Sequence, residues 1–308
     1  MGRFDEMHTF IRVVETGGIS AAALRLGVAK SAVSRRLQEL ENRLGAQLMR
    51  RTTRRVTLTD AGREFYQNSL RILEELEEAE HSLQSGQQAL SGRLRVNAPL
   101  ALGIRHLLPV IKLLQAEHPQ LVFDIDLDDR EIDIIQEGVD VLLRVGKLED
   151  SSMVARPLCP IRFLYCAAPD YLASRGEPKQ AADLIGHDGI GYNLMPQTQQ
   201  WWFETVRGRE QHLPHIRLSS NNGDLILRAA EAGMGVAELP TFVCHEAVAA
   251  GRLKPILSDH PHPPLHLYAI YSSRRHVPQR VRALIDFLAE WLADTPPWDA
   301  ELEGIVAM

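Results

Sequence analysis

The chain has 308 residues, of which 45% are hydrophobic and 24% charged, and it carries 34 Lys and Arg against 40 Asp and Glu. This composition supports two or three domains with buried cores and excludes a disordered polymer. Three scattered cysteines, Cys159, Cys166 and Cys244, exclude a disulfide framework and a zinc motif. Acidic residues near the N-terminus argue against a signal peptide, and no segment reaches the roughly 20 apolar residues of a membrane span.

Charge is distributed unevenly along the chain. Residues 1–59 carry 11 Lys or Arg against 5 Asp or Glu, whereas the remainder carries 23 against 35. A basic head on an acidic body is typical of a nucleic-acid-binding segment attached to a domain with another role. A DNA-packaging protein, which is one alternative, would be basic over most of its length.

An amphipathic helix is predicted near the N-terminus, where apolar residues recur at intervals of three and four from Phe4 to Val14. After two glycines, Ser20 is expected to cap a short helix that Gly27 ends. A further helix is predicted over residues 30–44, with one buried seam. The seam consists of Val33, Leu37, Leu40 and Leu44.

The opposite face of the helix over 30–44 carries polar side chains that can hydrogen-bond to base edges in a major groove. The basic arm that follows is predicted to be a two-stranded wing whose arginines contact phosphates or the minor groove. The expected DNA contacts are Lys30, Ser31, Ser34, Arg35, Gln38, Arg51, Arg54 and Arg55. Because Ala29 supplies no cap, Ser31 is also a candidate cap of a shortened helix. An ordinary three-helix domain with solvated arginines is the alternative interpretation.

A long helix is predicted from Thr59, which can cap it, to about residue 90. Its apolar residues have nearly heptad spacing, and such a stripe needs a partner, which we expect to be the same helix of a second subunit. The expected dimerisation residues are Phe65, Leu73, Leu76 and Leu83. Packing of the stripe on its own chain is the alternative.

Strands and helices alternate beyond residue 91, which predicts parallel sheets with helices on their faces. The predicted helices span residues 104–117, 132–137, 223–232, 241–250 and 281–292. Residues 296–308 have no periodicity and are expected to be a loose tail.

Residues 10–62, FIRVVETGGISAAALRLGVAKSAVSRRLQELENRLGAQLMRRTTRRVTLTDAG, resemble the DNA-binding segment of LysR-type transcriptional regulators. The resemblance continues to about residue 295 through EGVDVLLRVG, GMGVAELP and a final helix after a proline. It implies an α+β winged helix-turn-helix, a long linker helix and an α/β effector domain of two lobes resembling periplasmic binding proteins. The implied boundaries are 1–59 for DNA binding, 60–91 for the linker and dimerisation helix, and 92–295 for effector binding, with lobe I at 92–162 and 265–295 and lobe II at 163–264.

The same resemblance implies a cytoplasmic regulator of transcription that binds double-stranded DNA as a homodimer or homotetramer and responds to a small-molecule effector. RNA polymerase is a further candidate partner, and neither a cofactor nor a membrane is expected. A cleft without a ligand, with control by a protein partner or by autorepression alone, is an alternative that the sequence leaves open.

In open α/β sheets ligands bind beyond the carboxyl ends of the strands. The expected effector contacts are Pro99, Leu100, Ala101, Leu102, Asp128, Arg144, Gly146, Trp201, Trp202, Asn222, Glu238 and Pro240. No hydroxyl follows Pro99, and Asp128 and Asp129 would repel an anion, so an apolar or aromatic effector is favoured over a small inorganic anion or a dicarboxylate. The tryptophans are alternatively core residues, Asn222 a helix cap, and Arg144 the partner of a neighbouring Asp.

Catalytic motifs are lacking. The sequence contains no nucleophile elbow, Walker loop, Rossmann glycine pattern or zinc motif. Of its 12 histidines, five fall among prolines or at strand edges and not on a helix that could supply ligand spacing, namely His212, His215, His260, His262 and His266. An enzyme built on the α/β domain is therefore the weakest of the alternative functions.

Overall fold

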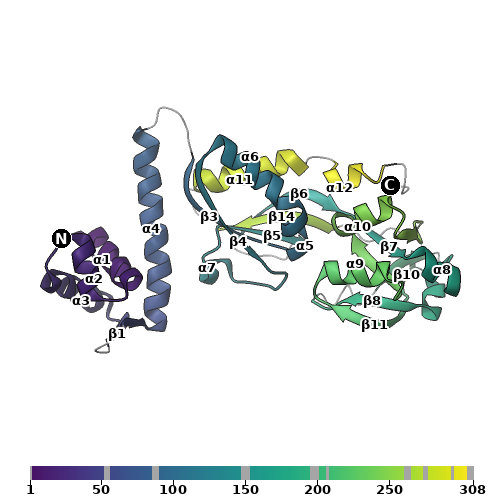
Figure 1. Ribbon diagram of the computed structural model, residues 1–308, viewed down its shortest axis with the longest axis horizontal. Helices are drawn as coiled ribbons and strands as arrows, with labels where there is room; N and C mark the ends of the chain where they lie inside the picture. The colour runs from purple at the N-terminus through teal and green to yellow at the C-terminus, as the bar shows by residue number, and fades with distance from the viewer. Residues whose placement is uncertain are drawn as a thin grey trace. The chain divides into compact units, whose positions relative to one another are not determined.

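The computed structural model describes residues 2–51, 56–84, 90–146, 153–194, 201–205, 208–259, 265–272, 277–292 and 295–303 (Figure 1). The chain divides into two compact units, which are Met1–Arg93 with Ile135–Gly138, and Leu94–Ile134 with Val139–Met308. Among the described residues, no helix is both long enough and apolar enough to cross a membrane.

The first unit contains three short helices, a two-stranded ribbon and one long helix. These are α1 (Arg3–Thr16), α2 (Ile19–Leu26), α3 (Lys30–Leu44), β1 (Met49–Arg51), β2 (Val56–Leu58) and α4 (Asp60–Gln84). The three short helices enclose a core, and the ribbon contributes to it through the residues that lead into β1. The core consists of Phe10, Val13, Ala22, Ala23, Val33, Leu37, Leu40, Leu48 and Met49.

Local signals placed most helix ends in this unit correctly, with one exception. The predicted cap at Ser20 is wrong, because α2 begins at Ile19 with Gly18 in the capping position. Helix α3 begins at Lys30 although Ala29 offers no side-chain cap, so Ser31 is not the cap of a shortened helix. Leu44 is 38% exposed instead of buried, because the helix ends there. The cap of α4 is confirmed, since Thr59 Oγ1 accepts a hydrogen bond from the N–H of Gly62 at 2.9 Å.

The first residue of the apolar stripe on α4, Phe65, packs within its own chain. The ring of Phe65 lies 5.4 Å from that of Phe10 and packs against the core of the first unit, and its contact with a second subunit stays a prediction. Leu73 and Leu76 are half-buried. The side chain of Leu83 lies outside the described part of the structure, as do residues 85–89, over which the helix was predicted to continue.

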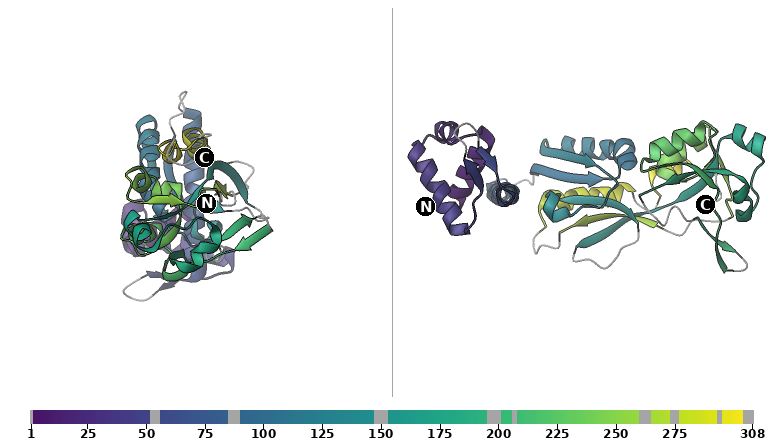
Figure 2. Two further views of the ribbon diagram at one scale, coloured as in Figure 1. Left: turned by 90° about the vertical axis from the view of Figure 1, so that its right-hand side faces the viewer. Right: turned by 90° about the horizontal axis from the view of Figure 1, so that it is seen from below.

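Lobe I of the second unit is a five-stranded sheet covered by helices. Its elements are β3 (Ser91–Ala98), α5 (Leu100–Leu102), a π-helical turn (Gly103–Leu107), α6 (Leu108–Glu117), β4 (Gln120–Leu127), β5 (Val141–Gly146), β6 (Val154–Ile161), β14 (Leu265–Tyr271) and α11 (Gln279–Leu292). The short helix α7 (Ile134–Glu137) falls mainly in the stretch that belongs to the first unit. The strand order is β4-β3-β5-β14-β6. Helices α6 and α11 lie side by side against this sheet (Figures 1 and 2).

Lobe II is a second five-stranded sheet with the order β11-β8-β12-β7-β13. Its elements are β7 (Phe163–Ala167), α8 (Pro169–Arg175), a 3-10 helix (Ala181–Gly186), β8 (Asp188–Tyr192), β9 (Trp202–Thr205), β10 (Gly208–Gln211), β11 (His215–Ser220), α9 (Gly223–Glu231), β12 (Val236–Pro240), α10 (Thr241–Ala249) and β13 (Lys254–Ile256). Because side chains alternate along a strand, Cys166 packs with α9 and α10, whereas Tyr165 packs with Trp201 on the opposite face.

The sheets are mixed, and the prediction of wholly parallel sheets is wrong. Strands β3 and β5 are parallel, but β14 is antiparallel to β5 and β6. The physical reason is the passage of the chain between the lobes. It leaves lobe I along β6, enters lobe II as β7 after Arg162, and returns along β14, so the outgoing and returning strands run in opposite directions where they pair.

The prediction of a loose tail is wrong for residues 296–303. Helix α12 (Pro297–Ala300) packs against α10, and Trp298 is 1% exposed. Its ring lies 4.6 Å from that of His106 and 5.9 Å from that of Phe242. The buried side chains of Trp298 and Leu302 anchor this segment, and a test for periodicity does not detect them.

We predict that Trp298→Ala lowers the free energy of unfolding of the second unit by about 3–5 kcal/mol, because it leaves a large cavity in the core. Chemical denaturation followed by circular dichroism measures the change. Pro297→Ala, at an exposed neighbouring position, is the control. An unchanged denaturation midpoint in the Trp298 variant would contradict the packing described for the tail.

Candidate functional site

Helix α3 presents one face to solvent because its other face is held in the core. Val33, Leu37 and Leu40 are fully buried. Arg35 and Gln38 lie on the opposite side and are exposed. The helix is therefore available over its whole exposed face for contact with another molecule.

The arginines of α3 have two different roles. Arg43 Nε lies 3.1 Å from Glu6 Oε2, and Arg36 Nη1 donates to Thr9 Oγ1 at 3.2 Å. Both partners belong to α1, so these two arginines fasten α3 to its neighbour. Arg35 instead points outward and pairs with Glu39 at 3.7 Å, one helical turn away. Such an exposed pair is weak, so the guanidinium can readily exchange it for another partner.

The predicted DNA contacts of α3 gather on this exposed face. Lys30, Ser31, Arg35 and Gln38 are exposed, and Ser34 is half-buried. The ribbon is found where a wing was expected, with β1 and β2 antiparallel and with Arg50 opposite Thr57 in register. Arg50 is exposed. The side chain of Arg51 and all of Arg54 and Arg55 lie outside the described residues.

The second unit contains a pocket that both lobes line. It encloses about 850 Å³ of space, part of which is open to solvent. The lining residues are Pro99, Ala101, Asp129, Arg144, Val145, Phe163, Ile190, Tyr192, Trp201, Gly223, Ile226, Glu238, Pro240, Phe242 and Val243. Most of these side chains are apolar or aromatic, which is typical of a small-molecule site.

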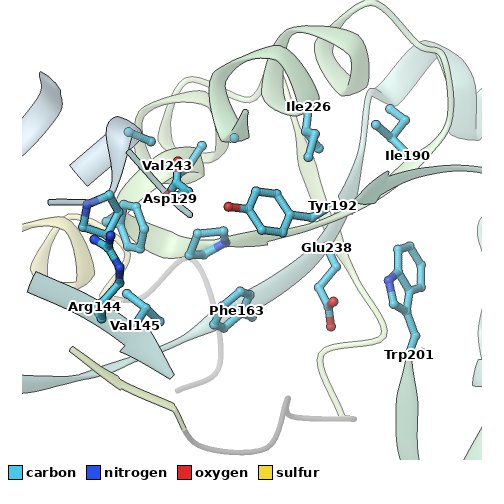
Figure 3. A pocket seen from close by; sticks show the side chains of 15 residues that line it. Asp129, Arg144, Val145, Phe163, Ile190, Tyr192, Trp201, Ile226, Glu238 and Val243 are labelled. Atoms are coloured by element: carbon cyan, nitrogen blue, oxygen red, sulfur yellow. The ribbon is translucent and has the colours of Figure 1, made fainter. Parts of the chain in front are cut away.

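The few polar groups of the pocket are separated. Figure 3 shows Arg144 and Asp129 at one end and Glu238 beside Trp201 at the other, with Tyr192 between them. A ligand that spans the pocket would therefore have an apolar body, with polar groups of the protein at each end.

The chain itself supplies partners to the polar groups at the Arg144 end. Arg144 donates from Nη1 to the carbonyl of Leu143 at 2.9 Å and from Nη2 to the carbonyl of Arg130 at 2.8 Å. Burial lowers the pKa of Arg144 and raises the pKa of Asp129. Hydrogen bonding to Arg130 lowers the pKa of Asp128, whose carboxylate turns away to that residue.

The first backbone N–H of the helix that starts at the pocket already donates a hydrogen bond within the chain. Free N–H groups at a helix start favour an anionic ligand, but this helix begins at Leu100, whose N–H donates to Asp129 Oδ2 at 3.3 Å. A carboxylate of the protein thus stands where an anion would bind. This arrangement disfavours small anions.

Burial in an apolar wall makes Glu238 difficult to ionise. Desolvation raises its pKa to about 8, and the hydroxyl of Tyr165 offsets part of the rise. The two residues are directly opposite each other on antiparallel strands β12 and β7. At neutral pH Glu238 is therefore mainly protonated and presents a neutral group to the pocket.

Half of the predicted effector contacts line the pocket, and half do not. Those that do are Pro99, Ala101, Arg144, Trp201, Glu238 and Pro240. Leu102 is instead buried in the core, and Asn222 caps α9 by accepting hydrogen bonds from the N–H groups of Asp224 and Leu225. Among the described residues, Leu100, Asp128, Gly146 and Trp202 are also outside the lining. Trp201 is both a core residue and a wall of the pocket.

The lining residues that the sequence did not reveal belong mainly to lobe II. Phe163, Ile190, Ile226 and Val243 look like ordinary core residues in the sequence. Tyr192 is the exception, because it ends strand β8 and the rule that ligands bind at carboxyl ends of strands could have identified it.

The two lobes are joined next to the pocket by side chains of the π-helical turn. Arg105 Nε donates to Asp224 Oδ1 at 3.1 Å, and its Nη1 lies 3.6 Å from Glu246. His106 Nε2 lies 2.8 Å from the carbonyl oxygen of Phe242. Burial lowers the pKa of His106 and favours its neutral form. Lobe I thus holds lobe II through side chains that lie close to the pocket.

Comparison with known proteins agrees with this organisation. Residues 4–63 match the model of the bacterial regulatory helix-turn-helix protein, lysR family, and residues 87–293 match the LysR substrate binding domain. The regulator CrgA of Neisseria meningitidis serogroup C is 33% identical over 292 residues, which cover 94% of this chain and 97% of that protein. The regulator PtxR of Pseudomonas aeruginosa is 35% identical over 292 residues, which cover 95% and 94%.

Solved structures give the same result. The structure of CrgA from Neisseria meningitidis superposes with a TM-score of 0.62 at 30% identity, covering 94% of this chain and 99% of the other. That of ArgP from Mycobacterium tuberculosis, at 18% identity, shares the fold with a TM-score of 0.64 and coverage of 94% and 98%. With a helix-turn-helix head, an effector-type domain and relatives that are regulators, the chain belongs to the LysR family of DNA-binding transcriptional regulators.

Proposed function

We propose that this regulator recognises its operators with the exposed face of α3. Arg35 would contact guanine, and Gln38 would contact adenine, as the geometry of their hydrogen-bonding groups favours. Lys30, Ser31 and Ser34 would complete the contact. The observation that carries this proposal is that these side chains share one outward face while Arg36 and Arg43 are bound to α1. The arginines of the wing, Arg51, Arg54 and Arg55, would contact the phosphates.

The active form is proposed to be a homodimer, or a pair of dimers, joined through α4. Leu73 and Leu76 are only half-buried within one chain, which supports their contact with a second copy of the helix. Two heads joined in this way would place two α3 helices in successive major grooves about 34 Å apart. The proposed domain roles are DNA binding for residues 1–59, dimerisation for 60–91 and effector binding for 92–295.

The proposed effector is an apolar or aromatic small molecule bound in the pocket of the second unit. The apolar lining supports this class, as do Asp129 at the helix start and the neutral Glu238. An effector that binds one arrangement of the lobes more tightly than another would shift the population toward that arrangement, and only this difference in affinity can drive regulation.

The proposed setting is the cytoplasm, where the chain would bind chromosomal DNA and could contact RNA polymerase. The proposal assigns no catalytic activity to the α/β domain. Its relatives CrgA and PtxR are transcriptional regulators, which supports a regulatory role for that domain.

We predict that Arg35→Ala weakens binding to the specific sites by about 1–3 kcal/mol and relaxes preference at one base position. Capture of sheared genomic DNA by the purified protein, followed by sequencing, measures both effects. Arg12→Ala is the matched control, because Arg12 pairs with Glu15 on α1 and lies outside the proposed reading face. Base selectivity that is the same in the Arg35 variant and the wild type would rule out this face.

We predict that Arg51→Ala weakens binding to every duplex alike, because phosphate contacts do not depend on sequence. The slope of log affinity against log salt should become shallower by about 0.9 for each phosphate that the variant no longer neutralises. Fluorescence anisotropy with a duplex of arbitrary sequence at several salt concentrations gives this slope. A slope equal to that of the wild type would show that Arg51 does not contact phosphate.

We predict that a neutral aromatic probe, N-phenyl-1-naphthylamine, binds the pocket several-fold more weakly at pH 9 than at pH 7. Below about pH 8 the Glu238 carboxyl is protonated, whereas above it the wall of the pocket gains a charge that an apolar ligand would desolvate. Probe fluorescence measures the affinity, and Glu238→Gln should bind equally at both pH values. If probe affinity changed with pH in the same way in the wild type and in Glu238→Gln, Glu238 would not be responsible for the pH dependence.

A further inference from the structure

The backbone at the start of the wing is bound by a side chain of helix α3. Glu41 Oε1 accepts hydrogen bonds from the N–H of Leu48 at 2.8 Å and from the N–H of Met49 at 3.2 Å. Leu48 and Met49 are 2% and 1% exposed and belong to the core of the first unit. One side-chain oxygen thus provides the hydrogen-bond acceptor for two buried main-chain N–H groups, which would cost free energy if left without one. Strand β1 therefore starts from a point fixed to α3.

The carbonyl of Leu48 accepts hydrogen bonds from Thr59, the residue just before the long helix α4. The N–H of Thr59 donates to the Leu48 carbonyl at 3.0 Å, and the Thr59 hydroxyl lies 3.1 Å from that oxygen and 2.7 Å from the carbonyl of Gln47. The hydroxyl also caps α4 through the N–H of Gly62. Leu48 is thus held on its N–H side by α3 and on its carbonyl side by the residue before α4.

Gly62 allows this close approach. A Cβ atom at this position would lie 1.9 Å from the Leu48 carbonyl oxygen, so any other residue would push the first turn of α4 away from the junction. The glycine of the LTDAG segment is needed for contact between two backbones and not for an unusual backbone angle.

The wing depends on this attachment because it is small. Strands β1 and β2 have three residues each and form a two-stranded sheet of their own. A two-stranded ribbon is marginally stable by itself. The exposed Arg50 follows directly after Met49, so the direction of the arm relative to α3 is set where the backbone is anchored.

We propose that Glu41 and Thr59 are positioning residues, which bind the Leu48 backbone from opposite sides and so hold the wing and α4 in a fixed orientation relative to the reading helix. A change in the direction of α4 would then turn the wing and α3 together. This inference goes beyond the contacts proposed above, and it rests on them only in assigning the wing to phosphate.

The test compares Glu41→Leu with Glu41→Gln in the full chain. Leucine removes the acceptor, whereas glutamine removes the charge and keeps an oxygen that can accept both N–H groups. We expect Glu41→Leu to bind a duplex of arbitrary sequence about threefold to tenfold more weakly near physiological salt, with a slope against salt shallower by about 0.9 for each phosphate that the wing no longer reaches. Glu41→Gln should stay close to the wild type, and so should base preference in both variants.

A purely structural role would give a different result. In that case Glu41→Leu would lower the unfolding temperature, but the protein that remains folded would bind with the wild-type slope. Thr59→Val, which keeps the shape and removes the hydroxyl, tests the carbonyl side in the same way, with Thr59→Ser as the variant expected to restore the wild-type slope.

The outcomes separate this inference from the proposed function. A shallower salt slope in Arg51→Ala together with a wild-type salt slope in Glu41→Leu would overturn the positioning role, while the proposed contact of the wing with phosphate would stand. A Glu41→Gln variant that behaves like Glu41→Leu would overturn it as well, because charge and not the hydrogen bonds would then be responsible. Unchanged salt slopes in both Arg51→Ala and Glu41→Leu would show that the wing does not contact phosphate, and the inference would be overturned with it.

Discussion

Helix α3 keeps one face free of the core and is still held rigidly, and the first unit depends on how these two requirements are met. The buried seam supplies the attachment, and side chains at the edges of the helix supply the orientation. Arg36 and Arg43 bind α1 on one side. Glu41 binds the start of the wing on the other. The polar groups that hold the helix are thus distinct from those that face outward.

The second unit follows a related logic, because the chain satisfies most of the polar groups that its pocket contains. Asp129 accepts the first helical N–H, and Arg144 donates to two main-chain carbonyls. Glu238 is neutral at physiological pH because of its burial. The pocket therefore presents mainly apolar side chains to a ligand, while Arg105 and His106 connect the two lobes beside the site.

The sequence predicted those features that depend on near neighbours in the chain. The bounds of α3 agree with the predicted range, because helical spacing and glycine stops are local properties. Thr59 was correctly assigned as a cap for the same reason. The prediction failed where a distant contact decided the outcome. Trp298 packs on His106 and Phe242 and anchors a segment that has no periodicity.

The sequence by itself thus determined the family, and it predicted the order of the domains and the residues that would face a DNA groove, because sequence motifs and helical spacing are local properties. Only the tertiary structure decided which arginines of α3 bind α1, which residues line the pocket, and why Gly62 is required. These properties depend on the distance between residues that lie far apart in the chain. The raised pKa of Glu238 is of the same kind, because burial in the folded domain and not the residue itself removes the water that would stabilise its charge.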